Sequence, residues 1–322
     1  MSRIGYHCSH EQFAPGELLR LVQRAEDAGF QSAMCSDHYF PWSEAQGQSG
    51  FAWSWLGAAL QATRLSFGVV TVPGGWRYHP AVLAQAAATL CAMFPGRFWM
   101  APGSGEALNE HVVAERWPPK PERNARLREA VEIMRALWAG ETVTHHGLLH
   151  VEDAKLSTLP PEPPQVVGPA LTPETAQWLG GWADGLITTA QPREKLRAIV
   201  EAFRRGGGEG KPLFLQAQLA FARTEAEALR GAHEQWAPVS LPSTVLGDLR
   251  LPKQFEDAAK YVRPEDLPGN IRISADWERH VEWLHEDVEM GFVEINLHNV
   301  TREQDRFLDV FGEHALPALA QG

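Results

Sequence analysis

The stretch RIGYHCSHEQFAPGELLRLVQRAEDAGFQSAMCS, residues 3–36, holds the pattern that decides the fold. Residues 3–7 (RIGYH) and 32–36 (SAMCS) are two short runs, and each predicts a buried strand. Between the runs, Pro15 suits the first turn of a helix, leucine, valine and alanine recur on one face, and Gly29 ends the pattern. A helix between two buried strands predicts a parallel β–α–β unit.

The same alternation of strand and helix continues to the end of the chain. Further strands are predicted at residues 65–72, 98–101, 165–167, 185–188, 213–221 and 292–297. Helices are predicted at 80–93, 122–138 and 277–289, and others begin at 173, 192 and 301. Roughly eight such units favour a closed (β/α)8 TIM barrel of the α/β class over an open doubly wound sheet. Neither G-x-G-x-x-G after the first strand nor G-x-x-x-x-G-K-[ST] occurs, so the usual nucleotide-binding motifs are absent from the sequence.

The length of 322 residues fits two average domains or one barrel of ~250 residues with insertions. We expect a single domain over residues 1–322, because three segments interrupt the alternation without ending it. They lie near 43–50, which is polar and rich in glycine, near 142–150, which predicts a hairpin around Gly147, and near 238–268, which contains several prolines. In a barrel such segments are loops, and the loops at the carboxyl ends of the strands hold the active site.

The composition argues against several classes of protein. Lys and Arg number 29 against 40 Asp and Glu, and the resulting net charge of −11 argues against nucleic acid or an anionic membrane as a partner. No run of ~18 apolar residues could span a bilayer and no signal segment opens the chain, so we expect a cytoplasmic protein. The three cysteines predict neither a disulfide framework nor a zinc site. The 12 tryptophans are more than core packing usually needs.

Ionisable residues cluster where three of the predicted strands end. The first strand runs into YHCSHE (6–11), the second into SDH (36–38) with Trp42 close behind, and the strand at 98–101 into GSGE (103–106). The carboxyl ends of parallel strands meet at one rim, so we expect these side chains to share a pocket. An imidazole, several carboxylates and an indole suit proton transfer beside a flat aromatic ligand.

Each of these side chains also has a purely structural explanation. His38 could be a partly buried histidine paired with Asp37, Glu106 could stabilise the start of the next helix through its dipole, and Trp42 could be packing. A different class of function, a metal-dependent barrel hydrolase, is also open, with His7, His10, Asp37 and His38 as its ligands. A third reading is a cofactor-binding protein with little turnover.

Six stretches of the chain resemble one known family. They are GYHCSHEQFAPGELL (5–19), AMCSDHYFPW (33–42), RYHPAVLAQAAATL (77–90), FPGRFWMAPGSGEALNE (94–110), ERNARLREAVEIMRALWAGETV (122–143) and GGWADGLITT (180–189). With these stretches the sequence resembles the luciferase-like monooxygenase superfamily, and within it the branch of deazaflavin-dependent glucose-6-phosphate dehydrogenases. The resemblance implies a (β/α)8 barrel, a homodimer, and a flavin or deazaflavin ring across the carboxyl ends of the strands.

The resemblance implies a role for four catalytic side chains. His38 takes the place of the family's catalytic histidine, and Trp42 that of the indole facing the reactive part of the cofactor. Glu106 takes the place of the acid that exchanges a proton with the cofactor ring, and Glu11 that of a carboxylate on the substrate side. The implied reaction is hydride transfer between the cofactor and a small alcohol-like or sugar-like substrate. The other possibility is monooxygenation, for which a flavin reductase would supply reduced FMN.

The resemblance also implies a set of cofactor-binding residues. They are Asp37, Val70, Thr71, Gly103, Ser104, Gly105, Leu171, Thr172 and Thr189. The Val70–Thr71 bond falls where the family often holds a cis peptide, and Leu171-Thr172 replaces a Gly-Gly pair that lets the backbone approach the cofactor phosphate. The opening GYHCSHEQF and the segment FAWSWLGAALQAT (51–63) resemble a sub-branch thought to use FMN. FMN is therefore the expected cofactor, and the deazaflavin coenzyme F420 is the alternative.

The expected substrate-binding residues depart from the family at one position. Lys195 and Arg272 keep the places of two cations that bind the sugar phosphate in the dehydrogenases, whereas Asp257 stands where the third is a lysine. A carboxylate repels a phosphate instead of binding it, so the sequence predicts a substrate other than glucose 6-phosphate.

Overall fold

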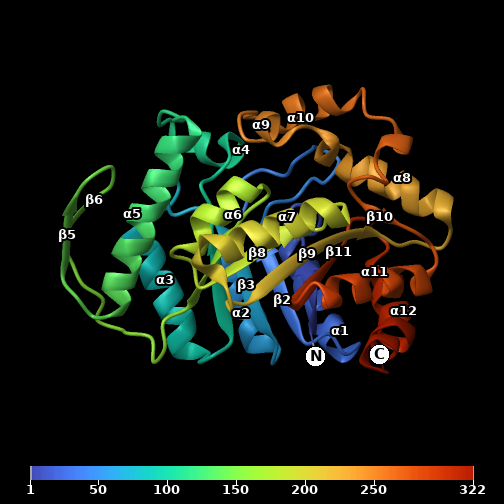
Figure 1. Ribbon diagram of the computed structural model, residues 1–322, viewed down its shortest axis with the longest axis horizontal. Helices are drawn as coiled ribbons and strands as arrows, with labels where there is room; N and C mark the ends of the chain where they lie inside the picture. Colours follow the sequence, from blue (N-terminus) through green and yellow to red (C-terminus); the bar gives the residue numbers. More distant parts are fainter. Residues whose placement is uncertain (1, 322) are drawn as a thin grey trace.

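The chain forms a closed barrel of eight parallel strands inside a layer of helices (Figure 1). The structure is a computed structural model and describes residues 2–321. Around the barrel the order is β9, β11, β1, β2, β3, β4, β7 and β8, and β8 pairs with β9 to close it. The strands are β1 (Arg3–Cys8), β2 (Ser32–Ser36), β3 (Ser66–Thr71), β4 (Phe98–Pro102), β7 (Gln165–Pro169), β8 (Gly185–Thr189), β9 (Leu213–Ala220) and β11 (Phe292–Asn299). The predicted (β/α)8 fold is confirmed.

Helices surround the strands and cover their outer faces. The longer ones are α1 (Pro15–Asp27), α2 (Ala52–Ala62), α3 (Pro80–Met93), α5 (Lys120–Trp138), α6 (Pro173–Gly180), α7 (Arg193–Phe203), α8 (Glu225–Trp236), α10 (Pro252–Ala259), α11 (Trp277–Glu289) and α12 (Gln304–Val310). Short turns of helix are α4 (Ala107–Glu110), η1 (His111–Val113), η2 (Arg204–Gly208), η3 (Ala237–Ser240), α9 (Ser243–Leu246), η4 (Pro264–Asp266), η5 (Phe311–Ala315) and α13 (Leu316–Gln321). No helix of residues 2–321 is both long and apolar enough to cross a membrane.

One indole fills much of the barrel interior. Trp99 of β4 packs with Phe214 of β9 and with apolar side chains from β2, β7 and β8. It occupies the space beside Gly68 of β3, where a Cβ atom would lie 2.0 Å from the indole ring. Because protein interiors are closely packed, a glycine at this position lets the large ring fit without a void.

Two insertions extend from the barrel in different directions (Figure 1). The first is the predicted hairpin, formed by β5 (Val143–His146) and β6 (His150–Ala154). Glu129 of α5 holds its tip by accepting hydrogen bonds from His145 Nε2 at 3.0 Å and from the backbone N–H of Leu149 at 3.1 Å. The second is the 238–268 segment, whose helices α9 and α10 lie near α4 at the carboxyl end of the barrel.

Candidate functional site

The carboxyl ends of β1 and β2 bring Glu11 and His38 together. Glu11 is 1% exposed and accepts hydrogen bonds from the hydroxyls of Ser36 at 2.6 Å and Ser9 at 2.9 Å. Its Oε1 lies 3.1 Å from Nδ1 of His38. Burial by itself raises the pKa of Glu11, but His38, the Ser36 hydroxyl and His7 outweigh it and lower the pKa to about 2. Glu11 is therefore a fixed negative charge beside His38.

The Asp37 carboxylate is held by the end of β3 and by the loop that follows it. Its Oδ2 accepts from the Thr71 hydroxyl at 2.8 Å, and its Oδ1 accepts from the Tyr78 hydroxyl at 2.9 Å and lies 3.4 Å from Nη1 of Arg77. Arg77 also donates to the backbone carbonyl of Asp37 at 2.8 Å. The structural reading that paired His38 with Asp37 is therefore wrong, since the carboxylate near His38 belongs to Glu11.

Arg77 links two buried carboxylates at this rim. Besides Asp37, it contacts Glu110 of α4, which accepts from Arg77 Nε at 3.0 Å and from its backbone N–H at 3.1 Å. The Arg77 side chain is 7% exposed and both carboxylates are 0% exposed. Sequence reasoning assigned no role to Arg77 or Tyr78, although both lie in the stretch RYHP (77–80). Their position after a predicted strand was the signal that could have identified them.

Trp42 completes the wall beside His38. The indole meets the imidazole edge to face, with ring centroids 5.2 Å apart and planes at 68°. Its backbone N–H donates to Gln46 Oε1 at 2.8 Å, and this fixes the start of the 43–50 loop. The predicted neighbourhood of histidine, carboxylate and indole is thus present at the end of β2.

Glu106 stands at the start of α4, after the sharp turn Gly103-Ser104-Gly105. Gly105 has φ +82°, and a Cβ there would lie 2.9 Å from Val72, so this turn requires glycine. The Glu106 side chain makes no capping hydrogen bond, so hydrogen-bonded capping of α4 does not account for it. Burial raises the pKa of Glu106 above its ordinary value, and Glu110 and Glu11 raise it further against the effect of His38. This environment favours the protonated carboxyl.

The turn is tied to the neighbouring strand and helix. The backbone N–H of Gly103 donates to the Thr71 carbonyl at 2.8 Å, and Lys120 Nζ donates to the Ser104 hydroxyl at 2.5 Å. The N–H of Asp37 likewise donates to the Val70 carbonyl at 3.1 Å. Residues 2–321 contain no cis peptide bond, so the cis bond expected at Val70–Thr71 is corrected to trans. The Val70 and Thr71 carbonyls accept hydrogen bonds from the neighbouring strand ends and so continue the regular ladder of the parallel sheet.

A cleft of ≈ 600 Å³ opens beside His38. It is lined by His38, Tyr39, Ser49, Phe51, Arg77, Tyr78, Val112 and Val113. Sites for small ligands and cofactors span roughly 300–1,000 Å³ and combine apolar walls with a few polar groups, and the cleft has both properties. On β8 the buried hydroxyl of Thr188 has no hydrogen-bond partner among the described residues. The rim therefore fits a planar aromatic cofactor that carries polar substituents.

The residues expected to bind the cofactor's far end lie after β7 and β8. Leu171 is 49% exposed, and the Thr172 hydroxyl caps α6 by accepting from the backbone N–H of Thr175 at 3.4 Å. Thr189 ends β8 in register with Gln216 of β9. Lys195 is exposed on α7. These side chains lie after strands of the same barrel as His38, but they form no hydrogen bond or ion pair with the group around Glu11.

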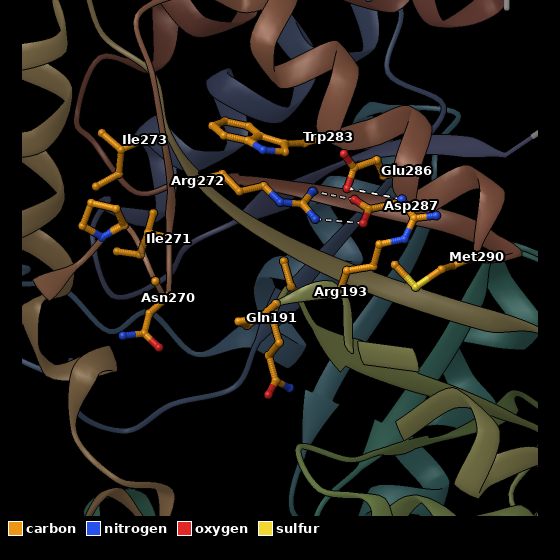
Figure 2. A pocket seen from close by; sticks show the side chains of 14 residues that line it. Gln191, Arg193, Asn270, Ile271, Arg272, Ile273, Trp283, Glu286, Asp287 and Met290 are labelled. Carbon is orange, nitrogen blue, oxygen red and sulfur yellow. Dashed lines mark hydrogen bonds and ion pairs between the residues drawn. The ribbon is translucent and has the colours of Figure 1, made fainter. Parts of the chain in front are cut away.

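Arg272 lies in a second pocket, of ≈ 350 Å³, between the start of α7, the short strand β10 (Arg272–Ile273) and α11 (Figure 2). Its guanidinium forms a two-pronged ion pair with the buried Asp287, at 2.5 and 2.8 Å. Nearby, Arg193 lies 3.7 Å from Glu286. Asp257 is likewise bound, by Lys253 at 2.5 Å and Lys260 at 2.6 Å. Arg272 is therefore already paired with a carboxylate, and Asp257 is paired with two lysines. These residues and Lys195 do not form the group of free cations that would bind a phosphate.

The side chains of the hydrolase hypothesis do not converge. The His7 ring packs against His298 with centroids 4.2 Å apart and planes tilted by 34°, and the His10 ring meets Trp55 edge to face at 4.9 Å. Burial lowers the pKa of both His7 and His10 to about 4, so both are neutral at pH 7. Within residues 2–321, no three His, Cys, Asp or Glu side chains are grouped so that they could hold a metal ion.

Comparison with known proteins adds to this geometry. A family described as luciferase-like monooxygenase matches residues 1–294. A protein of Beutenbergia cavernae named F420-dependent glucose-6-phosphate dehydrogenase is 35% identical over 329 residues, covering 99% of this chain and 98% of the relative. A protein of the same name from Intrasporangium calvum is 36% identical, with 99% of each covered. A solved structure of an F420-dependent secondary alcohol dehydrogenase with an F420-acetone adduct superposes with a TM-score of 0.90 at 31% identity, over 99% of both chains.

Proposed function

The chain belongs to the luciferase-like monooxygenase family, and from that premise we propose that it is an F420-dependent dehydrogenase of small, uncharged secondary alcohols. It is an oxidoreductase that uses a flavin or deazaflavin cofactor. The names of the Beutenbergia and Intrasporangium relatives and of the solved alcohol dehydrogenase support the deazaflavin over FMN. The homodimer expected from the resemblance stays a prediction, which light scattering of the purified protein tests.

The charge of the cleft is the observation that carries the choice of substrate. Arg77 is the one cationic side chain among the residues that line it, and Asp37 and Glu110 already neutralise this cation. Phe51, Val112 and Val113 supply apolar wall. A sugar phosphate is normally held by charge-assisted hydrogen bonds from free Arg or Lys side chains. A small neutral alcohol needs none, so it suits this cleft better.

His38 is the side chain placed to take the hydroxyl proton of the alcohol. With Nδ1 next to Glu11, the imidazole leaves Nε2 to accept that proton. The Glu11 carboxylate stabilises the positive charge that the ring then gains, as the carboxylate does in other His–carboxylate pairs. A bound flavin or deazaflavin supplies the ring atom that accepts hydride. The Trp42 indole packs edge to face with the imidazole and limits how the ring can turn.

Glu106 is the second proton carrier of the site. Burial raises the pKa of Glu106, which favours the protonated carboxyl that an acid needs. His38 and Glu106 thus occupy different environments, one beside a fixed carboxylate and the other in a setting that disfavours charge. We assign His38 the role of base toward the alcohol and Glu106 the role of acid.

The test uses purified protein loaded with F420, with 2-propanol or glucose 6-phosphate as the reductant. We expect 2-propanol to bleach the absorbance of the oxidised cofactor and glucose 6-phosphate to leave it unchanged. His38→Ala should lower the rate by ~10²–10⁴-fold, which is the usual contribution of a general base. His146→Ala, at an exposed histidine on the distant hairpin, is the matched control and should keep the full rate. Bleaching by glucose 6-phosphate alone would overturn the proposal. Oxygen consumption with reduced FMN would point to the monooxygenase alternative.

A further inference from the structure

The 238–268 segment closes over the site at three points. The Gly247 carbonyl accepts from the backbone N–H of Ala107 at 3.1 Å, directly after Glu106. Asp248 lies 3.6 Å from Nη1 of Arg123. Glu256 Oε1 accepts from the backbone N–H of Glu44 at 2.8 Å, two residues after Trp42. The segment is therefore fastened to the loops that follow β2 and β4, where the proposed catalytic side chains stand.

Phe255 is the one buried side chain of α10. It is 0% exposed, whereas Lys253, Asp257 and Lys260 around it are at least half exposed. Its ring meets the Trp42 indole edge to face, with centroids 5.2 Å apart and planes at 82°. Trp42 in turn meets His38 at 5.2 Å. The three rings form a continuous row from α10 to the proton acceptor.

Trp42 has apolar contacts besides the one with His38. The indole packs against the apolar cluster that includes Ala220 and Trp236, and it also contacts the Phe255 ring. The half-buried indole turns about two side-chain torsions, and such a turn would carry it away from His38. The fully buried Phe255 ring is in edge-to-face contact with the indole and therefore blocks its movement toward α10.

We propose that Phe255 is a positioning residue that fixes the Trp42 indole against His38 and thereby limits the size of the alcohol that the site accepts. The proposal rests on the proposed dehydrogenase function for its substrate and on the row of rings for its geometry. Shortening Phe255 leaves room for the indole to retreat from His38. Small alcohols then lose the wall that orients them, and bulky alcohols gain space.

The test compares Phe255→Leu with Phe307→Leu in F420-loaded protein. Phe307 of α12 is also 0% exposed and lies in the packing between barrel and helices, so it controls for the loss of buried ring. For Phe255→Leu we expect the ratio of kcat/KM for 1-phenylethanol to that for 2-propanol to rise at least about tenfold, since one methylene in a pocket is worth ~10–200-fold. Phe307→Leu should leave the ratio unchanged. Phe255→Met, whose longer unbranched side chain can still reach the indole, should restore most of the original ratio.

A second readout follows the indole itself, without turnover. Protein labelled with 5-fluorotryptophan gives a fluorine NMR signal for Trp42, which Trp42→Phe identifies by its loss. Phe255→Leu should shift or broaden this signal and Phe307→Leu should not. A moved signal with an altered ratio supports the proposal, whereas an unmoved signal, or a moved signal with an unaltered ratio, overturns it. If the unaltered protein oxidises no alcohol, the proposed function fails, and the fluorine signal alone then decides whether Phe255 holds Trp42.

Discussion

Replacing Arg77 by methionine removes the cation between two buried carboxylates. Methionine has a similar length and no charge, so the change leaves Asp37 and Glu110 without their ion-pair partner. It also removes the hydrogen bond to the Asp37 carbonyl, which anchors the backbone next to His38. We expect the variant to be less stable and to lose activity, because both consequences follow from the same guanidinium.

The size of the loss follows from the burial of the pair. The Arg77 side chain is 7% exposed and the two carboxylates are 0% exposed, so water cannot replace the lost partner. Breaking such a buried pair costs about 3–5 kcal/mol. With an unfolding entropy near 2.1 cal/mol/K per residue, 322 residues lose about 1.5 °C of Tm per kcal/mol. Arg77→Met should therefore melt about 4–7 °C below the unaltered protein at pH 7.

The loss should depend on pH in a definite direction. Burial raises the pKa of Glu110 and Arg77 opposes that effect, so the pKa rises further when Arg77 is removed. A carboxyl with a raised pKa in the folded state supports folding at low pH and loses that contribution as pH rises through the raised pKa. The gap in Tm between variant and unaltered protein should thus be smaller at pH 5 than at pH 8.

Calorimetry at both pH values and the alcohol assay give the two readouts. Arg3→Met is the control, because Arg3 pairs with the buried Glu294 at 2.7 Å but stands at the opposite, amino-terminal end of β1. It should lower Tm while the folded variant keeps its kcat. For Arg77→Met we expect kcat to fall at least about tenfold. A cost below about 1 kcal/mol at pH 7, or a gap in Tm that grows as pH falls, would refute the reasoning.

Three further substitutions test other parts of the structure. Gly68→Ala places a Cβ 2.0 Å from the Trp99 ring and should cost at least about 1–3 kcal/mol in urea unfolding, so an unchanged midpoint would contradict the packing. Glu11→Gln should cost roughly 3 kcal/mol at pH 7, because the pKa of Glu11 is lowered to about 2. That contribution is present above about pH 4.5 and is lost as pH falls toward 2, so an equal cost at pH 3 would contradict it. Glu106→Gln should bind F420 within a few-fold of the unaltered affinity by fluorescence titration while turnover falls about 100-fold, and full turnover would exclude Glu106 as a proton carrier.

Local signals predicted most of the barrel. The strand at 32–36 and the helices at 80–93 and 277–289 begin and end at the predicted residues, since short apolar runs, an early proline and a helical period mark them. The helix at 52–62 was not predicted, because its alanines, leucines and tryptophans are buried on several sides and leave no amphipathic period.

The site could be predicted only in part. The rim with Glu11, His38 and Trp42 follows from the positions of strand ends, which depend on local sequence. The partners of these side chains do not follow from local sequence. Which carboxylate contacts His38 depends on the register of β1 against β2, and Arg77 reaches Asp37 from a loop 40 residues away. Phe255, more than 200 residues from Trp42, gave no local signal.

Transfer of deuterium tests the central claim most directly. The protein loaded with F420 is incubated with 2-propanol that carries deuterium on its secondary carbon, and the reduced cofactor is analysed by mass spectrometry. Direct hydride transfer in the cleft beside His38 predicts one deuterium in each reduced cofactor, and His38→Ala should slow its appearance by ~10²–10⁴-fold. Reduced cofactor without deuterium, or reduction by glucose 6-phosphate and by no secondary alcohol, would contradict the account.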